Sequence, residues 1–180
     1  MVKRDIKENI DLIINKENDY SIYDIENCNA ITGNERFLYY QIKMSIIKAE
    51  KIDIIVSFLM ESGVQMLLKD LKNALDRGVQ IRILTGNYLG ITQPSALYLL
   101  KKELDDRIDL RLYNNLNKSF HPKSYIFHGK SESEIYIGSS NVSRSALTSA
   151  VEWNYRFTDK LDKINFDIFY NTFEDLFDKH

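Results

Sequence analysis

Residues 52–84 read IDIIVSFLMESGVQMLLKDLKNALDRGVQIRIL, and this stretch decides the expected fold. It begins with a β-branched apolar run, residues 52–58, that is short enough to be a buried strand. Over residues 63–77 apolar side chains recur at helical spacing, and Gly78 is a natural place for that helix to stop. A second strand is expected at residues 79–84. This succession of strand, helix and strand predicts an α/β domain with at least a partly parallel sheet.

Further helices and strands are expected on both sides of this stretch. Upstream, apolar residues at helical spacing follow Asn34, which we expect to be the N-cap of a helix. Downstream, the alternation of strand and helix gives way to a hairpin, so the sheet should be mixed. The other expected elements are a helix at 94–104, a strand at 108–113, hairpin strands at 123–127 and 134–137 joined by the loop 128–133, a short helix at 143–147, a strand at 151–157 and a helix at 165–177. The fold class is α/β, with a layered domain in which helices flank a mixed sheet.

The chain of 180 residues has the size of one domain with a full hydrophobic core. We expect a single domain over 1–180, with an N-terminal extension at 1–33 and a core at 34–180. Within the extension, Ile10 and residues 12–14 predict a short buried element. The chain is either a small stand-alone protein or a piece of a longer one.

Composition excludes several classes of protein. Hydrophobic residues make up 44% of the chain and charged residues 28%, which is typical of a soluble globular protein. The chain has no run of about 18 apolar residues, which a membrane span would need. Its charged N-terminus does not resemble a signal peptide. The one cysteine, Cys28, fits a reducing compartment, so we expect a cytoplasmic protein. The net charge of -2 argues against tight binding to an anionic membrane, but it leaves room for a local basic cleft that binds nucleic acid.

Candidate catalytic residues begin with His121 and Lys123, at the start of the first hairpin strand. Residues i and i+2 of a strand point to the same face, so the two side chains should lie side by side. An ammonium can hold phosphate oxygens, while an imidazole can attack phosphorus or move a proton. An isolated His-x-Lys triplet is more often only the polar start of a strand. Further residues must therefore support the interpretation as a phosphate site.

Two further pieces follow in the sequence. Gly138, Ser139, Ser140 and Asn141 come directly after the second hairpin strand, where they can offer N–H groups, hydroxyls and an amide to an anion. Taken alone, these residue types are typical of an ordinary turn. Glu152 is a carboxylate in an otherwise apolar expected strand. It is either solvated on an exposed face or buried with a partner, for which an imidazole N–H is suitable.

The combination of these motifs resembles the signature of the phospholipase D superfamily. The spacing from His121 to Asn141 and on to Glu152 is similar to that of its metal-independent nuclease and restriction-endonuclease branch. The stretch FHPKSYIF…IYIGSSNVSRSALTSAVEWN is similar to the phospholipase D-like domain at the N-terminus of some bacterial superfamily II helicases. Residues 120–154 carry this resemblance. The family often has an Asp five residues after the Lys, and the presence of His128 there favours nucleases over lipases.

The resemblance implies a function and a mechanism. Family members with one motif copy build their active site across a homodimer axis, where one His121 attacks phosphorus and the second protonates the leaving oxygen. Lys123, Asn141 and the hydroxyls of Ser139 and Ser140 would bind phosphate oxygens, and Glu152 would orient the imidazole. No metal and no cofactor is implied, and the expected substrate is DNA.

Three alternatives stay open at this point. The chain can be the cleavage module of a larger helicase or restriction protein that supplies DNA recognition. It can also be a non-catalytic nucleic-acid-binding or dimerisation module, although such a module has no need of all four candidate residues. A lipid hydrolase is disfavoured, because the chain has one motif copy and no membrane-seeking segment. Two minor candidates are Arg144, for a phosphate contact, and Tyr88, for base stacking.

Overall fold

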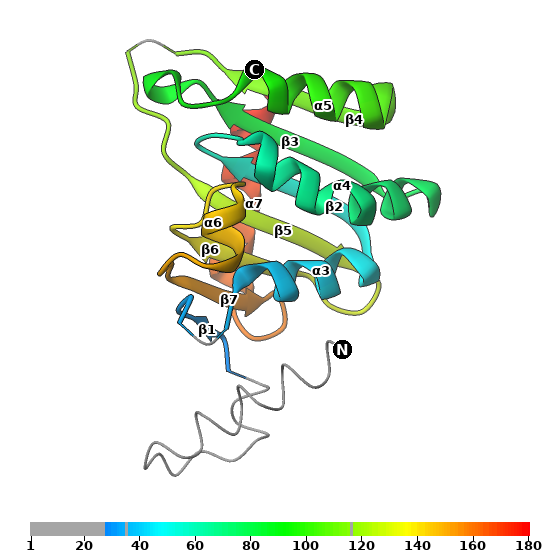
Figure 1. The fold of residues 1–180 in the computed structure, drawn as a ribbon. Coiled ribbons are helices and arrows are strands. Elements are labelled where there is room, and N and C mark those ends of the chain that lie inside the picture. Colours follow the sequence, from blue (N-terminus) through cyan, green and yellow to red (C-terminus); the bar gives the residue numbers. More distant parts are fainter. Residues whose placement is uncertain (1–27, 35, 116) are drawn as a thin grey trace.

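A seven-stranded mixed sheet forms the centre of the computed structural model, which describes residues 28–34, 36–115 and 117–180 (Figure 1). Its strand order is β1-β7-β6-β5-β2-β3-β4. The strands are β1 (Ala30–Ile31), β2 (Ala49–Val56), β3 (Gln80–Gly86), β4 (Ile108–Tyr113), β5 (Lys123–Gly129), β6 (Glu134–Gly138) and β7 (Asn154–Thr158). β2, β3 and β4 pair in parallel, whereas every other pairing is antiparallel. The predicted α/β fold with a mixed sheet is confirmed.

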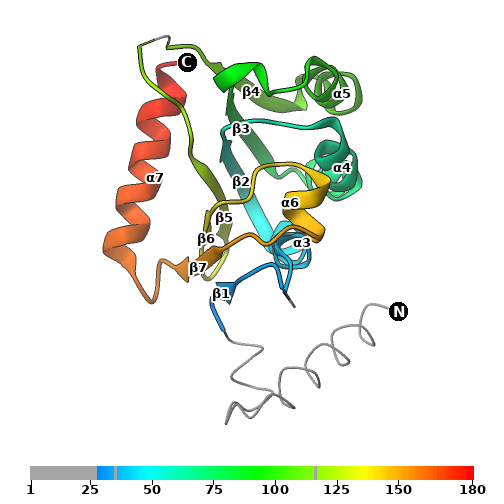
Figure 2. The ribbon, with the colours of Figure 1, turned by 60° about the vertical axis from the view of Figure 1, so that its left-hand side comes forward.

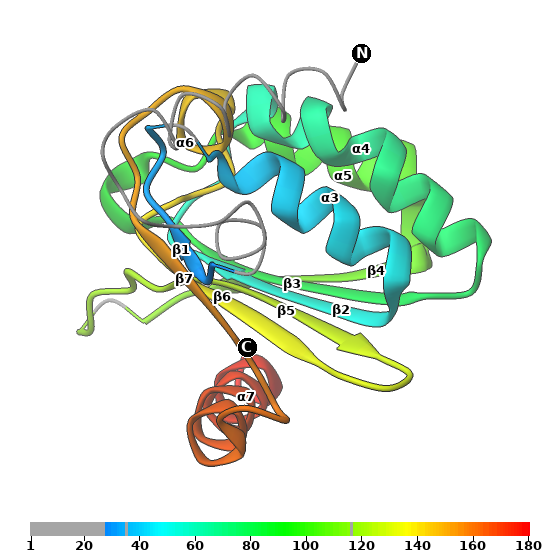
Figure 3. The ribbon, with the colours of Figure 1, turned by 90° about the horizontal axis from the view of Figure 1, so that it is seen from below.

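Helices cover both faces of this sheet. On one face lie α3 (Leu38–Lys48), α4 (Glu61–Asp76), α5 (Pro94–Leu104) and α6 (Arg144–Thr148), and α7 (Lys163–Asp178) covers the other face (Figures 2 and 3). Because side chains alternate along a strand, β2 supplies both layers. Ile54 and Val56 pack with the larger helical layer, and Ile55 packs with the aromatic residues of α7.

A buried ion network lies between the sheet and α7. The guanidinium of Arg82 in β3 donates to Asp53 in β2 through Nε, at 2.6 Å, and to Glu174 in α7 through Nη1, at 2.9 Å. Asp53 has no exposed surface, and its second oxygen lies 2.9 Å from Nε2 of His128. Burial works to raise the pKa of Asp53, but the hydrogen bonds from His128 and Arg82 outweigh it and leave the pKa lowered. The network joins α7 to three strands, β2, β3 and β5.

Several predicted boundaries were wrong, for local reasons. α3 begins at Leu38, and Phe37 instead of Asn34 occupies the N-cap position, because Phe37 still has extended backbone angles. His128 belongs to β5 and not to the hairpin loop, because β2 pairs with β5 as far as Gly129. Glu152 lies before β7 instead of inside a strand, because the pairing of β6 with β7 begins only at Asn154.

Of the expected N-terminal extension, residues 1–33, the structure describes residues 28–33. The sheet includes β1, which lies before residue 34, where the core was expected to start. The predicted buried element at residues 10–14 lies outside the described residues. In the described ranges, no helix is both long enough and apolar enough to cross a membrane.

The strand order brings four chain segments to one edge of the sheet, namely the edge formed by the ends of the strands and not by an outer strand. The end of β2 meets the start of β5, where Val56 is paired with Lys123. The end of β6 meets the start of β7, where Gly138 is paired with Asn154. Since β5 and β6 are themselves neighbours, the segments that carry the predicted site residues converge at this edge.

Candidate active site

Lys123 is the best-anchored residue of the candidate site. Its side chain is buried, and Nζ donates hydrogen bonds to the hydroxyl of Ser57, at 2.9 Å, and to the carbonyl of His121, at 3.0 Å. Nζ also lies 2.8 Å from Nδ1 of the His121 ring. The structure therefore brings His121 and Lys123 side by side, as their spacing predicted. The His121 ring itself is on an exposed residue, where a substrate can reach it.

The charge on Lys123 is held in a partly desolvated place. Burial lowers the pKa of its ammonium, and the negative charge of Glu152 opposes this change. A buried ammonium whose field is poorly screened by water attracts a phosphate oxygen more strongly than a solvated one does. Lys123 is thus suited to bind an anion that enters from the side of His121.

Ser57 belongs to this site, although the sequence analysis did not select it. Its fully buried hydroxyl accepts from Lys123 and donates to the carbonyl of Pro122, at 3.2 Å. It therefore fixes the rotamer of the lysine. The only signal in the sequence was a polar residue at the end of the apolar run of residues 52–58, and its contact with Lys123 depends on the pairing of β2 with β5.

Asn141 reaches the same edge from the turn after β6. It is 5% exposed, and its Oδ1 accepts a hydrogen bond from the backbone N–H of Phe58, at 3.1 Å. With the oxygen held in this way, Nδ2 is the end of the amide that can donate to an anion. Asn141 is thus positioned by the same segment of chain, residues 57–58, that positions Lys123.

The two serines before Asn141 differ in their surroundings. Ser140 has no exposed surface, and its hydroxyl accepts from Nδ2 of Asn154, at 2.9 Å, so its side chain supports the turn from inside. Ser139 is exposed, and its hydroxyl donates to the carboxylate of Glu152 and accepts from the N–H of Trp153, at 3.0 Å. Of the two hydroxyls, that of Ser139 is the one on the accessible side.

Glu152 lies on the half-buried segment that enters β7, and its contact with Ser139 ties this segment to the turn after β6. Its predicted hydrogen bond to an imidazole stays a prediction. Of the minor candidates, Arg144 is exposed at the start of α6, and the side chain of Tyr88 lies outside the described residues. Over the described ranges, no group of three or more His, Cys, Asp or Glu side chains is placed to hold a metal ion.

The edge of the sheet therefore combines an accessible imidazole, a desolvated ammonium, an oriented amide and a carboxylate. The first can act as nucleophile or base, the second and third can hold non-bridging oxygens, and the carboxylate can balance positive charge. These four groups are suited to catalyse a reaction at a phosphate group.

Comparison with known proteins identifies the family to which this fold belongs. A family model described as "Cardiolipin synthase, PLD-like domain" matches residues 42–179. Among solved structures, the chain is similar to Nuc from Salmonella typhimurium, a phospholipase D family member, with 21% identity, a TM-score of 0.62, and coverage of 83% of this chain and 92% of Nuc. NucT from Helicobacter pylori is 17% identical with a TM-score of 0.56, and 77% of this chain and 86% of NucT are covered.

A third similar structure is a larger enzyme, phosphatidylserine synthase from Haemophilus influenzae. It is 14% identical with a TM-score of 0.54, and 77% of this chain but only 37% of the synthase is covered. Among curated proteins no match was found. Because the family model spans most of the chain and the fold agrees with it, the chain belongs to the family of phospholipase D-like domains.

Proposed function

We propose that this chain is a metal-independent phosphodiesterase that cleaves nucleic acid, with DNA as the preferred substrate, through a covalent intermediate on His121. The observation that carries the proposal is the position of the Lys123 ammonium, buried and 2.8 Å from the ring of His121, at the edge where Asn141 also lies. A phosphate held by the ammonium and the amide would place its phosphorus next to the imidazole.

The reaction has two steps. In the first, a neutral imidazole nitrogen of His121 attacks phosphorus, the bond from phosphorus to the leaving oxygen breaks, and an acid on the opposite side protonates that oxygen. In the second, the resulting base takes a proton from water, whose oxygen attacks phosphorus while the bond to the histidine nitrogen breaks. Lys123 and Asn141 stabilise the charge on the non-bridging oxygens in both steps.

The mechanism needs a second acid–base group opposite the nucleophile, and we propose that a homodimer supplies it. The sequence has three histidines. His128 is bound to Asp53 beneath α7, and the ring of His180 lies 4.4 Å from that of Tyr113. We assign the role of the acid to the His121 of a second copy, related to the first by a two-fold axis. Each subunit would then supply one half of the site.

Nucleic acid is favoured over lipid as the substrate by two observations. The chain covers 92% of Nuc and 86% of NucT, but only 37% of the lipid-related synthase. The fold of this chain thus corresponds to most of Nuc and of NucT, but to only a part of the synthase. In addition, the pocket next to His121 is lined by four asparagines and one lysine, side chains that can bind the polar groups of a nucleotide.

Cleavage assays test the proposal. Labelled plasmid and oligonucleotides are incubated with the wild-type protein, with and without EDTA, and we expect cleavage that EDTA does not prevent. His121→Ala should lose at least about 10⁴-fold in rate, and Lys123→Met about 10²- to 10³-fold. Lys101→Met, at an exposed position of α5, is the matched control and should keep wild-type activity.

Three results would contradict the proposal. Activity that disappears with EDTA and returns with magnesium would replace the mechanism with metal catalysis. An active His121→Ala protein would remove the nucleophile. A wild-type protein that binds oligonucleotides but cleaves none would favour a binding module. A phosphoprotein adduct that is labile in acid, and a molecular mass in solution of two chains, are the expected supporting measurements.

A further inference from the structure

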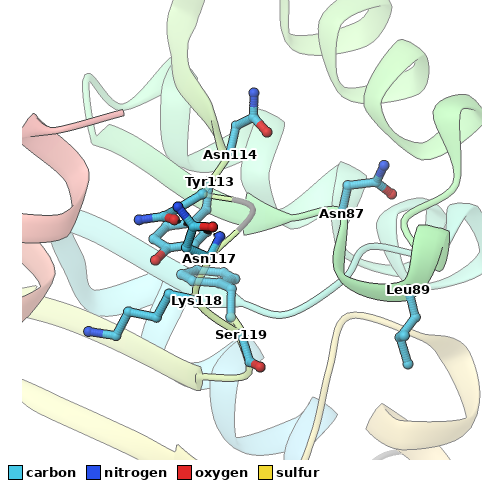
Figure 4. Close-up of a pocket in the computed structure, with 9 residues that line it drawn as sticks. Asn87, Leu89, Tyr113, Asn114, Asn117, Lys118 and Ser119 are labelled. Carbon is cyan, nitrogen blue, oxygen red and sulfur yellow. Dashed lines mark hydrogen bonds between the residues drawn. The ribbon is translucent and has the colours of Figure 1, made fainter.

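A pocket lies next to the candidate active site, between the loop that follows β3 and the segment that joins β4 to β5. Its volume is about 340 Å³, within the range of small-molecule sites. Figure 4 shows Asn87 and Leu89 on one side of it, with Asn114, Asn117 and Lys118 on the other. Asn115 and Ser119 complete the polar part of the wall. The lining thus offers four amides and one ammonium, and it contains no carboxylate.

The floor of the pocket is a fixed aromatic pair. The rings of Tyr113 and Phe120 stack with centroids 4.3 Å apart and an angle of 18° between their planes, and both residues are buried. Phe120 can approach β3 only because residue 86 is glycine, since a Cβ there would lie 2.6 Å from Cδ1 of the ring. This contact joins the segment before β5 to the end of β3. The pocket is therefore built by the fold.

The loop on the other side is held in a costly conformation. Leu89 has a φ of 56° and a ψ of 17°, the left-handed region that a branched side chain rarely adopts, and its side chain is 76% exposed. A hydrogen bond from the N–H of Gly90 to the carbonyl of Asn87, at 3.1 Å, closes this turn. The result is an apolar side chain presented at the rim of a polar pocket.

The pocket lining adjoins the candidate site residues along the chain. Ser119 and Phe120 line it, and His121 is the next residue along the chain. Two residues of extended backbone span about 7 Å. A chemical group bound in the pocket would therefore lie about this distance from a phosphate at His121. Lys118, on the same wall, can meet a neighbouring phosphate.

Amides are suited to one class of ligand in particular. Each presents a donor and an acceptor next to one another, the arrangement that pairs with the edge of a nucleobase. In a duplex the pairing edges are occupied by the opposite strand, whereas an unpaired base exposes them. An apolar side chain such as that of Leu89 can cover the face of such a base.

We propose that this amide-lined pocket binds the base of an unpaired nucleotide adjacent to the phosphate at His121. The inference deepens the proposed function and depends on it for the position of the phosphate. It makes single-stranded nucleic acid, or the frayed end of a duplex, the preferred substrate.

Binding experiments test the pocket without any need for turnover. Two labelled single-stranded nonamers are compared by fluorescence anisotropy, namely oligothymidylate and the same backbone with three central abasic residues, so that they differ in bases and not in phosphates. The wild-type protein should bind the first about tenfold more tightly, as expected for one or two hydrogen bonds to a base. The double variant Asn87→Ala/Asn117→Ala should reduce this preference to less than about twofold. Asn73→Ala, at an exposed position of α4, should keep it.

The outcomes separate this inference from the proposed function. A tenfold preference that survives in the double variant, with an unchanged circular dichroism spectrum, would overturn the pocket assignment, as would a wild-type protein with no preference at all. Wild-type protein that prefers the base-containing strand through the two asparagines but cleaves neither strand would support the pocket and overturn the proposed catalysis. A duplex of the same sequence that binds as tightly as the single strand would contradict the requirement for an unpaired base.

Discussion

Replacement of Arg82 by Met would test the buried network that attaches α7 to the sheet. Arg82 makes three hydrogen bonds to carboxylates, one to Asp53 and two to Glu174, and its guanidinium lies 4.9 Å from the ring centroid of Phe173. Methionine keeps the apolar stem over this ring but removes the charge and all three donors. Asp53, which is fully buried, would then keep His128 as its hydrogen-bond partner, at 2.9 Å, and the ammonium of Lys51, at 3.5 Å.

The expected cost follows from that geometry. Breaking a buried ion pair by removal of one partner costs about 3–5 kcal/mol. The remaining contacts of Asp53 with His128 and Lys51 place this variant at the lower end, about 3 kcal/mol. Urea denaturation followed by far-ultraviolet circular dichroism at pH 7 measures the free energy of unfolding. Arg107→Met is the matched control. It removes an exposed pair with Asp76, at 2.8 Å, and should cost less than about 1 kcal/mol.

A double variant distinguishes charge from packing. If the cost of Arg82→Met arises from an uncompensated carboxylate, then Asp53→Asn added to it should recover about half of the lost free energy. The reasoning would be refuted if Arg82→Met cost no more than Arg107→Met, or if the double variant lost the sum of the two single losses.

Three further predictions concern glycines and acid stability. Gly86→Ala should cost about 1–3 kcal/mol, because its methyl group would meet the ring of Phe120, and it should also weaken oligonucleotide binding as measured by anisotropy. Gly63→Ala should cost more than Gly86→Ala in the same urea assay, since the new Cβ would lie 2.5 Å from the backbone of Val142, which cannot rotate away; an equal or smaller cost would contradict this. The hydrogen bond from Arg82 lowers the pKa of Glu174 to about 2 from an ordinary value of 4.5, so its stabilisation is full above pH 4.5 and is lost as the pH falls toward 2. With its side chain 29% exposed we expect about 1–2 kcal/mol, and Glu174→Gln should flatten the pH dependence of unfolding between pH 5 and pH 3.

Elements with strong local signals could be predicted from the sequence. The bounds of α5 and β4 agree with those expected, because Pro94 starts the helix and apolar side chains recur at helical spacing through it. Boundaries set by a distant partner could not be predicted. β5 continues through His128 only because β2 is long enough to pair with it. Glu152 lies outside a strand, where its carboxylate accepts a hydrogen bond from the hydroxyl of Ser139 in the turn after β6.

The candidate site was predictable in part for the same reason. His121, Lys123 and Asn141 are recognisable by spacing, whereas Ser57 enters the site through the pairing of β2 with β5. The ion network left a weak signal that we did not use. Asp53 and Arg82 interrupt two apolar strands at equivalent positions, and they are direct partners in the parallel register.

The direction of β5 and β6 has a practical consequence. β5 runs away from the edge that carries His121, and β6 returns to it, so the turn at residues 130–133 is separated from the candidate site by the length of a strand, about 20 Å. Ser131 in this turn is exposed, and Cys28 is the only native thiol. A Ser131→Cys/Cys28→Ser protein would therefore accept a fluorophore at a position from which substrate docking and subunit exchange can be followed by energy transfer, without a dye in the path of the substrate.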